Sequence, residues 1–174
     1  YDYVPEWCLH KKIEYVQGGE NLKDSGKFFW AGTKKNEYYF TIDDDLMYPK
    51  EYFIRHLELL KNNTKCFISL HGKVLAHVPK LFRDVIENYH WSRTTENDIF
   101  INFPGTGVMV FDNSKYSFPI EMFKYHGMAD LWIAKYCQEN KIPCVLRKHE
   151  GNELIYLLDN KNTLWNAQAS MVEQ

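Results

Sequence analysis

Hydrophobic and polar residues alternate along the chain in blocks that predict strands and helices in turn. Apolar or aromatic runs of strand length occupy residues 38–42, 66–70, 99–103, 108–112 and 142–146. Apolar residues recur at helical spacing in 24–31, 49–62 and 79–91, and residues 131–137 are so uniformly apolar that they predict a buried helix. A further short strand is expected at 12–16, before the Gly18-Gly19 turn.

The sharpest contrast lies between Tyr38 and Pro49, where an apolar run ends in Asp43, Asp44 and Asp45. Three adjacent carboxylates repel one another unless a cation lies among them or water surrounds them. In an extended segment Asp43 and Asp45 share a face, which suits a divalent cation. The alternative is a solvated acidic turn that caps the helix opened by Pro49. The apolar strand directly upstream favours a metal site at the end of a buried strand.

Composition narrows the class of protein. The chain has 174 residues, of which 45% are hydrophobic, and this is enough for one core, so we expect a single domain over 1–174. The net charge of -2 gives no general attraction to nucleic acid or anionic lipid. Cys8, Cys66, Cys137 and Cys144 lack Cys-x-x-Cys spacing and predict free thiols in a reducing compartment. The sequence shows neither a stretch of about 20 apolar residues nor a signal peptide, so we expect a cytoplasmic protein, with peripheral membrane association compatible with this pattern.

Two further stretches carry candidate chemistry. Gly105, Thr106 and Gly107 separate two apolar runs. Glycines there let the backbone approach a ligand and offer its N–H groups, although the same residues suit a hairpin loop, so we expect both a turn and a pocket wall. Asp130 opens the buried helix, where a carboxylate is first of all a helix cap. Trp132 lies in the same stretch and is a candidate substrate contact.

Basic residues supply the remaining candidates. Arg147, Lys148 and His149 form a turn after the last strand, where the two cations could neutralise an anionic group and the histidine is either solvated or a ligand. Lys27 projects near the start of the helix at 24–31. A single lysine at such a position is commonly a solvated surface residue, and contact with a phosphate or base is the alternative.

The segment from Glu20 to Ala31, followed by Tyr38 to Asp45, resembles the nucleotide-sugar-dependent glycosyltransferases of GT-A fold, in particular family 2-like enzymes. Their pattern is an Asn-x-Gly-like turn, a helix with a basic residue, a small residue, and a strand that ends in an Asp-x-Asp motif. The matching positions here are Asn21, Lys27, Ala31, Asp43 and Asp45. Leu22 and Lys23 stand where the family has a small residue or glycine.

The resemblance implies a GT-A-like (Rossmann-like) α/β fold, with a mostly parallel sheet flanked by helices. It implies a UDP- or GDP-sugar donor, a glycan or other hydroxyl acceptor, Mn²⁺ or Mg²⁺, and a role in polysaccharide biosynthesis. The implied metal ligands are Asp43, Asp45 and His149. The implied contacts to the nucleotide and its diphosphate are Lys27, Asp43, Asp44, Arg147 and Lys148. The implied neighbours of the sugars are Gly105, Thr106, Gly107 and Trp132.

Asp130 has the position of the family's general base, which takes the proton of the acceptor hydroxyl and implies inversion at the anomeric carbon. The family usually has two acids there, and Ala129 replaces the first. Retention of configuration stays open. Enzymes of the family begin with a strand, a helix and a second strand that this sequence lacks, so we expect an N-terminally incomplete domain. The alternatives are a sugar-nucleotidyltransferase, whose glycine-rich basic signature is not visible here, and a non-catalytic nucleotide- or carbohydrate-binding module.

Overall fold

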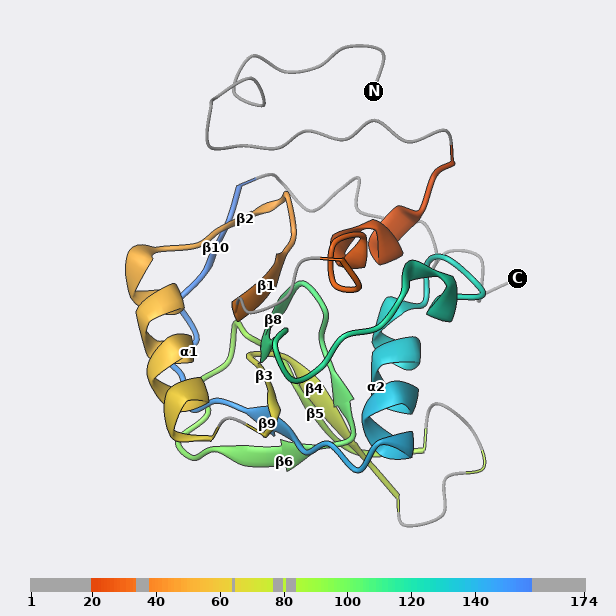
Figure 1. Cartoon of the computed structure of the whole chain (residues 1–174). Helices are drawn as coiled ribbons and strands as arrows, with labels where there is room; N and C mark the ends of the chain where they lie inside the picture. The colour runs from red at the N-terminus through yellow and green to blue at the C-terminus, as the bar shows by residue number, and fades with distance from the viewer. Residues whose placement is uncertain (1–19, 34–37, 64, 77–79, 81–83, 158–174) are drawn as a thin grey trace, which may run out of the picture.

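The fold is seen in a computed structural model that describes residues 20–33, 38–63, 65–76, 80 and 84–157 (Figure 1). The strand expected at 12–16, the Gly18-Gly19 turn and Cys8 lie outside the described residues. In chain order the elements are η2 (Lys23–Phe28), β1 (Tyr38–Ile42), β2 (Leu46–Met47), α1 (Lys50–Asn62), β3 (Phe67–Ser69), β4 (Gly72–Leu75), β5 (Val85–Tyr89), β6 (Ile99–Ile101), β7 (Phe103–Pro104), β8 (Val108–Asp112), η3 (Ile120–Met122), α2 (Ala129–Glu139), β9 (Cys144–Leu146) and β10 (Ile155–Tyr156).

The central sheet has five strands in the order β1-β8-β3-β9-β6. Strand β8 is antiparallel to both β1 and β3, and β6 is antiparallel to β9. The pairing of β3 with β9 is parallel. The smaller sheets, β5-β4-β7 and β10-β2, contain antiparallel pairs throughout their described strands. The predicted GT-A-like, Rossmann-like, mostly parallel sheet is therefore wrong, and the structure is mostly antiparallel.

The position of β8 explains this difference. Strands β1 and β3 are joined through α1 and both run opposite to β8, so they have the same direction, but β8 lies between them. The chain reaches β8 through β4, β5, β6 and β7, with no helix among the described residues of this segment, and it returns in the opposite direction. A crossover helix is what makes neighbouring strands parallel. Local hydrophobic patterns show the length of a strand but not its neighbour.

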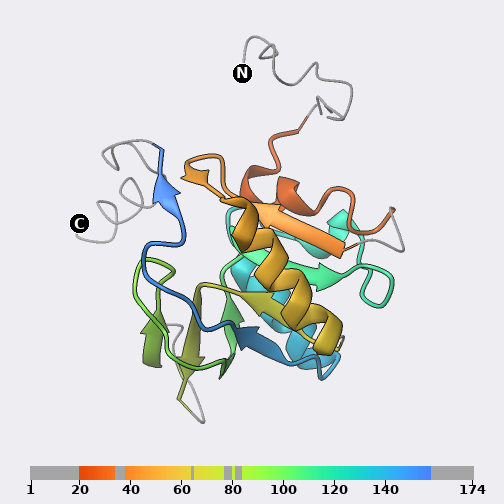
Figure 2. The same cartoon turned by 90° about the vertical axis from the view of Figure 1, so that its left-hand side faces the viewer.

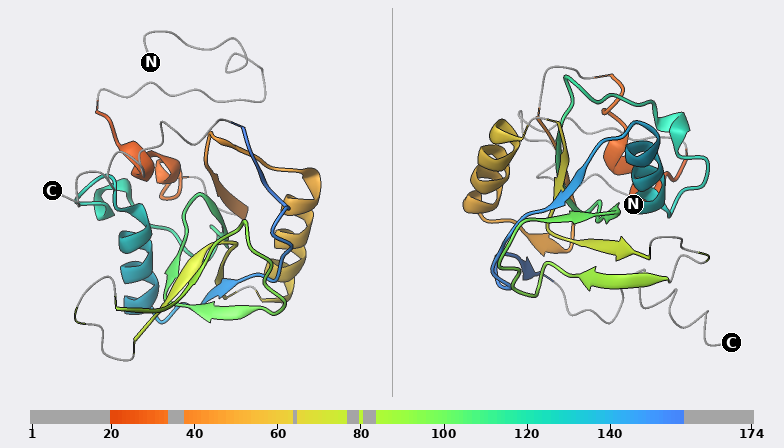
Figure 3. Two further views of the ribbon diagram at one scale, coloured as in Figure 1. Left: turned by 180° about the vertical axis from the view of Figure 1, so that it is seen from behind. Right: turned by 90° about the horizontal axis from the view of Figure 1, so that it is seen from below.

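The two helices lie on opposite faces of the central sheet (Figure 3). Alternation along β8 divides its side chains between these faces: Val110 packs with Leu60 of α1, whereas Met109 packs with Ile133 of α2. This period of two is expected for a strand that is buried on both sides. All five residues of β8 are buried, so β8 is the centre of the core.

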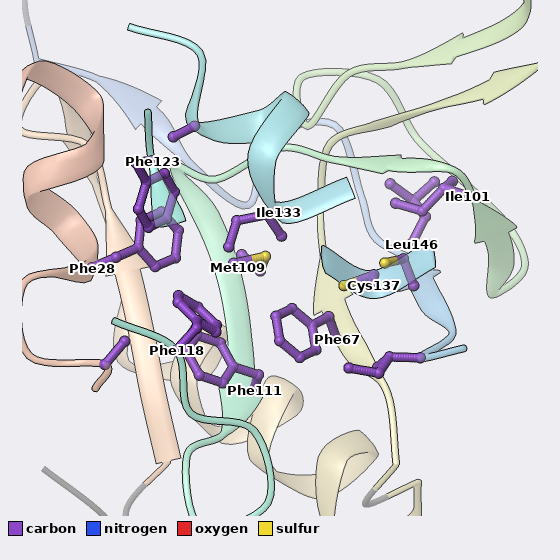
Figure 4. Close-up of a cluster of buried hydrophobic side chains, with 14 residues drawn as sticks. Phe28, Phe67, Ile101, Met109, Phe111, Phe118, Phe123, Ile133, Cys137 and Leu146 are labelled. Atoms are coloured by element: carbon purple, nitrogen blue, oxygen red, sulfur yellow. The ribbon is translucent and has the colours of Figure 1, made fainter. Parts of the chain in front are cut away.

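The core on the α2 side is aromatic (Figure 4). The rings of Phe67 and Phe111 stack with centroids 4.6 Å apart, and Phe28 of η2 stacks on Phe123 at 5.0 Å. Buried aromatic pairs of this kind add to the free energy of burying their surface. Phe28 thereby fixes η2 against the body of the protein, and this holds the neighbouring Lys27 in place.

Several predicted elements agree with the structure, one differs in its burial and one in its type. The predicted helices at 49–62 and 131–137 correspond to α1 and α2. The strand at 38–42 is confirmed, but it is a partly exposed edge strand and not a buried one, with Thr41 its one buried residue (Figure 2). Helical spacing at 79–91 was misleading, because 85–89 form strand β5, whereas 81–83 lie outside the described residues. Valine, isoleucine and tyrosine in β5 are residues that favour strands.

The cysteines and the helix lengths add two observations. Cys66, Cys137 and Cys144 are buried free thiols, as predicted. In the described part of the chain, every helix is too short or too polar to cross a bilayer.

Candidate functional site

The ends of three strands meet at one cavity. Ile42, the last residue of β1, pairs with Val108, the first residue of β8, and the Leu70 N–H after β3 donates to the Val108 carbonyl at 3.2 Å. The loops that follow β1 and β3 and the loop that precedes β8 therefore converge around a cavity of about 240 Å³. Its lining residues are Asp24, Lys27, Asp43, His71, Trp91, Gly105, Thr106, Gly107, Val108 and Asp130. Six of the candidates from the sequence are in this set: Lys27, Asp43, Gly105, Thr106, Gly107 and Asp130.

Asp43 is fixed from both sides of the cavity. Its carboxylate forms an ion pair with Lys27 of η2. Gly107 lies directly against this carboxylate, and a Cβ atom at Gly107 would collide with it. The glycine of the loop is therefore required for close approach of the loop to Asp43.

A tyrosine connects the backbones of the two loops. The Asp43 N–H donates to Tyr48 Oη at 2.8 Å, and the Tyr48 hydroxyl donates to the Gly107 carbonyl at 2.5 Å. The phenol ring packs against Tyr52 of α1 with centroids 5.0 Å apart. Tyr48 thus ties the acidic loop after β1 to the glycine loop before β8.

Replacing Tyr48 with Phe removes both hydrogen bonds and keeps the ring. We expect the free energy of unfolding to fall by about 1 kcal/mol, since a backbone donor and a backbone acceptor lose their shared partner. Urea denaturation measures this change. Tyr38→Phe, on the exposed end of β1, is the matched control and is expected to have no such effect. Equal stability of Tyr48→Phe and the control would show that the hydroxyl does not hold the loops together.

Asp130 is held by the glycine loop and not by its own helix. The Thr106 N–H and hydroxyl both donate to Asp130 Oδ1, at 2.8 and 2.6 Å. Among the described residues, Oδ2 accepts no hydrogen bond. One oxygen is therefore positioned by the protein, and the other can meet a substrate at the cavity.

The environment of Asp130 strengthens it as a base. The residue is exposed at the cavity, and other protein atoms lie around its carboxyl group. Burial raises the pKa of this carboxyl, the donors of Thr106 and the charge of Lys27 oppose the rise, and the charge of Asp24 adds to it. A carboxyl in a cleft with a raised pKa is a candidate for proton transfer.

The capping role considered for Asp130 belongs to Asp24. Asp24 accepts hydrogen bonds from the Gly127 N–H, just before α2, at 2.6 Å and from the N–H of Ala129, the first residue of α2, at 2.8 Å. A carboxylate there satisfies helix donors and interacts favourably with the helix dipole. This contact between η2 and α2 leaves Asp130 free to face Thr106.

Of the three adjacent acids Asp43, Asp44 and Asp45, the last two lie outside the cavity lining. Burial and the charge of Asp43 raise the pKa of Asp45, with a further contribution from Asp44. Asp44 is exposed. None of the three caps α1, whose N-cap is Pro49 without a side-chain hydrogen bond.

A divalent cation fits part of the predicted ligand set. The repulsion that Asp45 feels from Asp43 would be relieved by a cation between them, and Mg²⁺ or Mn²⁺ commonly binds one or two carboxylates together with substrate phosphates. Within the described residues, no group of three His, Cys, Asp or Glu side chains is placed to hold a metal. His149 is not beside Asp43 and does not complete the set.

Arg147, Lys148 and His149 line a second cavity, of about 720 Å³, between α1 and the segments 94–98 and 147–153. Arg147 pairs with Glu153 at 2.5 Å, and Arg55 of α1 pairs with the same carboxylate at 2.8 Å. His149 Nδ1 donates to the Arg147 carbonyl at 2.7 Å. The structure therefore does not bring this basic turn to the cavity that contains Asp43.

The Arg147–Glu153 pair predicts a dependence of stability on pH. Burial opposes ionisation of Glu153, but hydrogen bonds and charge from Arg147 outweigh it, so the pKa lies below its ordinary value of 4.5. A lowered pKa stabilises the fold above pH 4.5, and this contribution is lost as the pH falls through the folded-state pKa. We expect Glu153→Gln to lose less stability than the wild type between pH 7 and about pH 3 in urea denaturation. Glu58→Gln, in the same cavity, is the control, and identical acid sensitivity of wild type and Glu153→Gln would contradict the expectation.

Trp132 also lies elsewhere. Its Nε1 donates to the Tyr125 carbonyl at 3.1 Å, and its ring packs against the aromatic core. The sequence did not indicate Asp24, His71 and Trp91 as residues of the site, although all three line the cavity. Position after a buried strand could have indicated His71, since loops at strand ends carry ligands. No local signal marks Asp24 or Trp91, which reach the cavity through tertiary contacts.

Comparison of the chain with protein-family models and with curated proteins finds no match.

Proposed function

We propose that the protein is a metal-dependent glycosyltransferase that transfers a sugar from a nucleotide-diphosphate sugar to a hydroxyl acceptor. The observation that carries the proposal is the convergence of four separate segments, 24–27, 43, 105–107 and 130, on one cavity with a base of raised pKa. These are the segments through which the sequence resembles nucleotide-sugar-dependent glycosyltransferases. The proposal rests on the residues of the site and not on a parallel sheet.

Asp130 is the general base. The acceptor hydroxyl transfers its proton to Oδ2 of Asp130 as its oxygen attacks the anomeric carbon, and the bond from that carbon to the diphosphate breaks. Thr106 holds Oδ1 and so aims the other oxygen at the cavity. Attack opposite the leaving diphosphate inverts the configuration at the anomeric carbon.

The diphosphate belongs beside Lys27. The three carboxylates and one ammonium group that line the cavity give a net negative charge, which disfavours a bare diphosphate. Asp43 and Asp45 would hold the divalent cation, which supplies charge stabilisation to the leaving diphosphate. Lys27, already paired with Asp43, is placed to contact a phosphate oxygen.

The cavity is large enough for part of the substrate. Its 240 Å³ lies below the roughly 300–1,000 Å³ of pockets that enclose a drug-sized ligand. We place the terminal sugar of the acceptor and the reacting bond in the cavity, with the nucleoside of the donor outside it.

Calorimetric titration with UDP and GDP, each with and without Mn²⁺, tests the donor site. We expect binding that requires Mn²⁺ and is lost in Asp43→Asn and Asp45→Asn. Asp44→Asn is the matched control, because this neighbouring carboxylate is exposed and outside the cavity lining. Metal-independent binding, or equal loss in all three variants, would contradict the assignment of the two ligands.

Product analysis with UDP-glucose, UDP-galactose and GDP-mannose as donors and simple alkyl glycosides as acceptors tests the reaction. A new glycosidic bond, or slow release of free sugar, supports a transferase. Pyrophosphate exchange into the nucleotide sugar would instead show a nucleotidyltransferase, and tight binding without turnover would show a binding module.

A further inference from the structure

The lining of the site cavity contains both ionic and uncharged side chains. The ionic ones are Asp24, Lys27, Asp43 and Asp130, and the larger uncharged ones are His71, Trp91 and Val108. The proposed function assigns no role to His71 or Trp91, so their chemistry is an independent clue to the substrate.

His71 is held firmly in the lining of the cavity. Its carbonyl accepts hydrogen bonds from the Gly105 N–H at 2.8 Å and from the buried Ser69 hydroxyl at 2.9 Å. Its side chain lies so close to Gly105 that a Cβ atom there would come within 2.7 Å of His71 Cβ. The His90 ring packs at 4.9 Å on the imidazole. The imidazole is therefore a fixed part of the wall and borders the loop that holds Asp130.

The imidazole is also uncharged. Burial, with smaller contributions from the charges of His90 and Lys73, lowers the pKa of His71 to about 4. A neutral imidazole has one N–H donor and one nitrogen acceptor. Among the described residues, neither ring nitrogen of His71 has a hydrogen-bond partner, so both functions are available to a ligand that enters the cavity.

Trp91 supplies an apolar surface beside it. The residue is 6% exposed, and its ring is supported by Tyr156 at 4.6 Å and by His90 at 5.0 Å. A pyranose ring combines C–H groups, which pack on an aromatic surface, with hydroxyl groups, which pair with a neutral donor and acceptor. The rings of Trp91 and His71 both pack on His90, and together they form a wall of the cavity, the Trp91–His71 wall. This wall offers both kinds of contact.

We propose that the Trp91–His71 wall binds the terminal sugar of the acceptor, that this sugar is an uncharged hexopyranose, and that His71 pairs with one of its hydroxyl groups. The inference rests on the proposed function, since Asp130 acts on the same sugar. Among the described residues that line the cavity, Asp24, Asp43 and Asp130 are acidic and Lys27 is the one lysine or arginine, so an acidic sugar is disfavoured. The neutral wall does nothing to offset that negative charge.

Saturation-transfer NMR titrations with methyl β-D-glucopyranoside, methyl β-D-galactopyranoside and methyl β-D-glucuronopyranoside, in the presence of UDP, GDP and diamagnetic Mg²⁺, test this. We expect at least one neutral glycoside to bind about tenfold more tightly than the glucuronide. His71→Leu should weaken the neutral glycoside about tenfold, because a substrate hydroxyl loses its partner. His71→Gln, which keeps a donor and an acceptor, should bind within about threefold of the wild type.

Charge and the aromatic surface are tested by two more variants. His71→Lys should reduce or reverse the preference for neutral sugars, because it places a cation in the wall. Trp91→Phe should weaken the neutral glycoside with the melting temperature kept near that of the wild type, and Trp132→Phe, outside the cavity, is the control. Preference for the glucuronide, undiminished binding in His71→Leu, or no sugar binding at all would overturn the inference.

The two proposals fail in different ways. Neutral glycosides that bind through His71 to a protein with no affinity for UDP or GDP would refute the transferase and leave the sugar site intact. Transfer from a nucleotide sugar to an acidic acceptor would refute the sugar site and leave the transferase intact.

Discussion

Asp130→Asn is expected to lower the rate of sugar transfer by about 10²–10⁴-fold, which is the usual contribution of a positioned general base. The amide oxygen can still accept both donors of Thr106, so the side chain should keep its position. The amide nitrogen cannot take the acceptor proton. Steady-state kinetics with saturating donor measures the loss, and calorimetry with the nucleotide and Mn²⁺ should give a dissociation constant within about twofold of the wild type, since Asp130 does not contact the phosphates in the proposed complex.

The pH profile separates this role from a structural one. In the proposed mechanism the ionised carboxylate is the active form, so the wild-type rate should rise with pH through the raised pKa of Asp130 and then level off. Hydrogen bonds from Thr106 lower this pKa, so Thr106→Val should move the ascending limb to higher pH. Loss of nucleotide binding in Asp130→Asn, or a residual rate with an unchanged ascending limb, would instead make Asp130 a structural residue.

The sequence predicted the elements of this fold better than their arrangement. Most strands and both longer helices are local patterns of hydrophobic residues, and they are found close to where the patterns place them. The relative directions of neighbouring strands were not predicted, because β8 inserts between β1 and β3 and this insertion depends on tertiary packing. The stripe at 79–91 was ambiguous for a related reason: β-branched and aromatic residues fit a strand once β4 is available to pair with it.

The candidate site shows the same division. Local patterns together with the resemblance to glycosyltransferases indicated Lys27, Asp43, the loop at 105–107 and Asp130, and the structure brings them to one cavity. Arg147 and His149 were chosen by similar reasoning, but they lie in another cavity, where Glu153 engages the arginine. A charged residue in a predicted turn can interact with a partner, but the local sequence does not show which partner it binds. Its partner is decided by contacts between segments that are far apart in the sequence.

Asp24→Ala is expected to lower the free energy of unfolding by about 2 kcal/mol, because it removes a charged cap that accepts two N–H groups at the start of α2. Asp24→Asn should fall between this variant and the wild type, since an amide has a single oxygen to accept hydrogen bonds and carries no charge. Urea denaturation should therefore rank the wild type above Asn and Asn above Ala. Glu121→Ala, an exposed acid in the first turn of η3, is the matched control and should leave stability within about 0.5 kcal/mol of the wild type.

Asp24→Ala should change the rate of sugar transfer and the affinity for nucleotide to different extents. Asp24 holds the first turn of α2, and Asp130 is the second residue of that helix, so loosening the turn should displace the base from the acceptor. Lys27 and Asp43 are held by Phe28 and Tyr48, which the substitution does not touch. We therefore expect the transfer rate of Asp24→Ala to fall much more than its affinity for nucleotide and Mn²⁺. Parallel losses of rate and affinity would show that η2, and not only the start of α2, depends on this carboxylate.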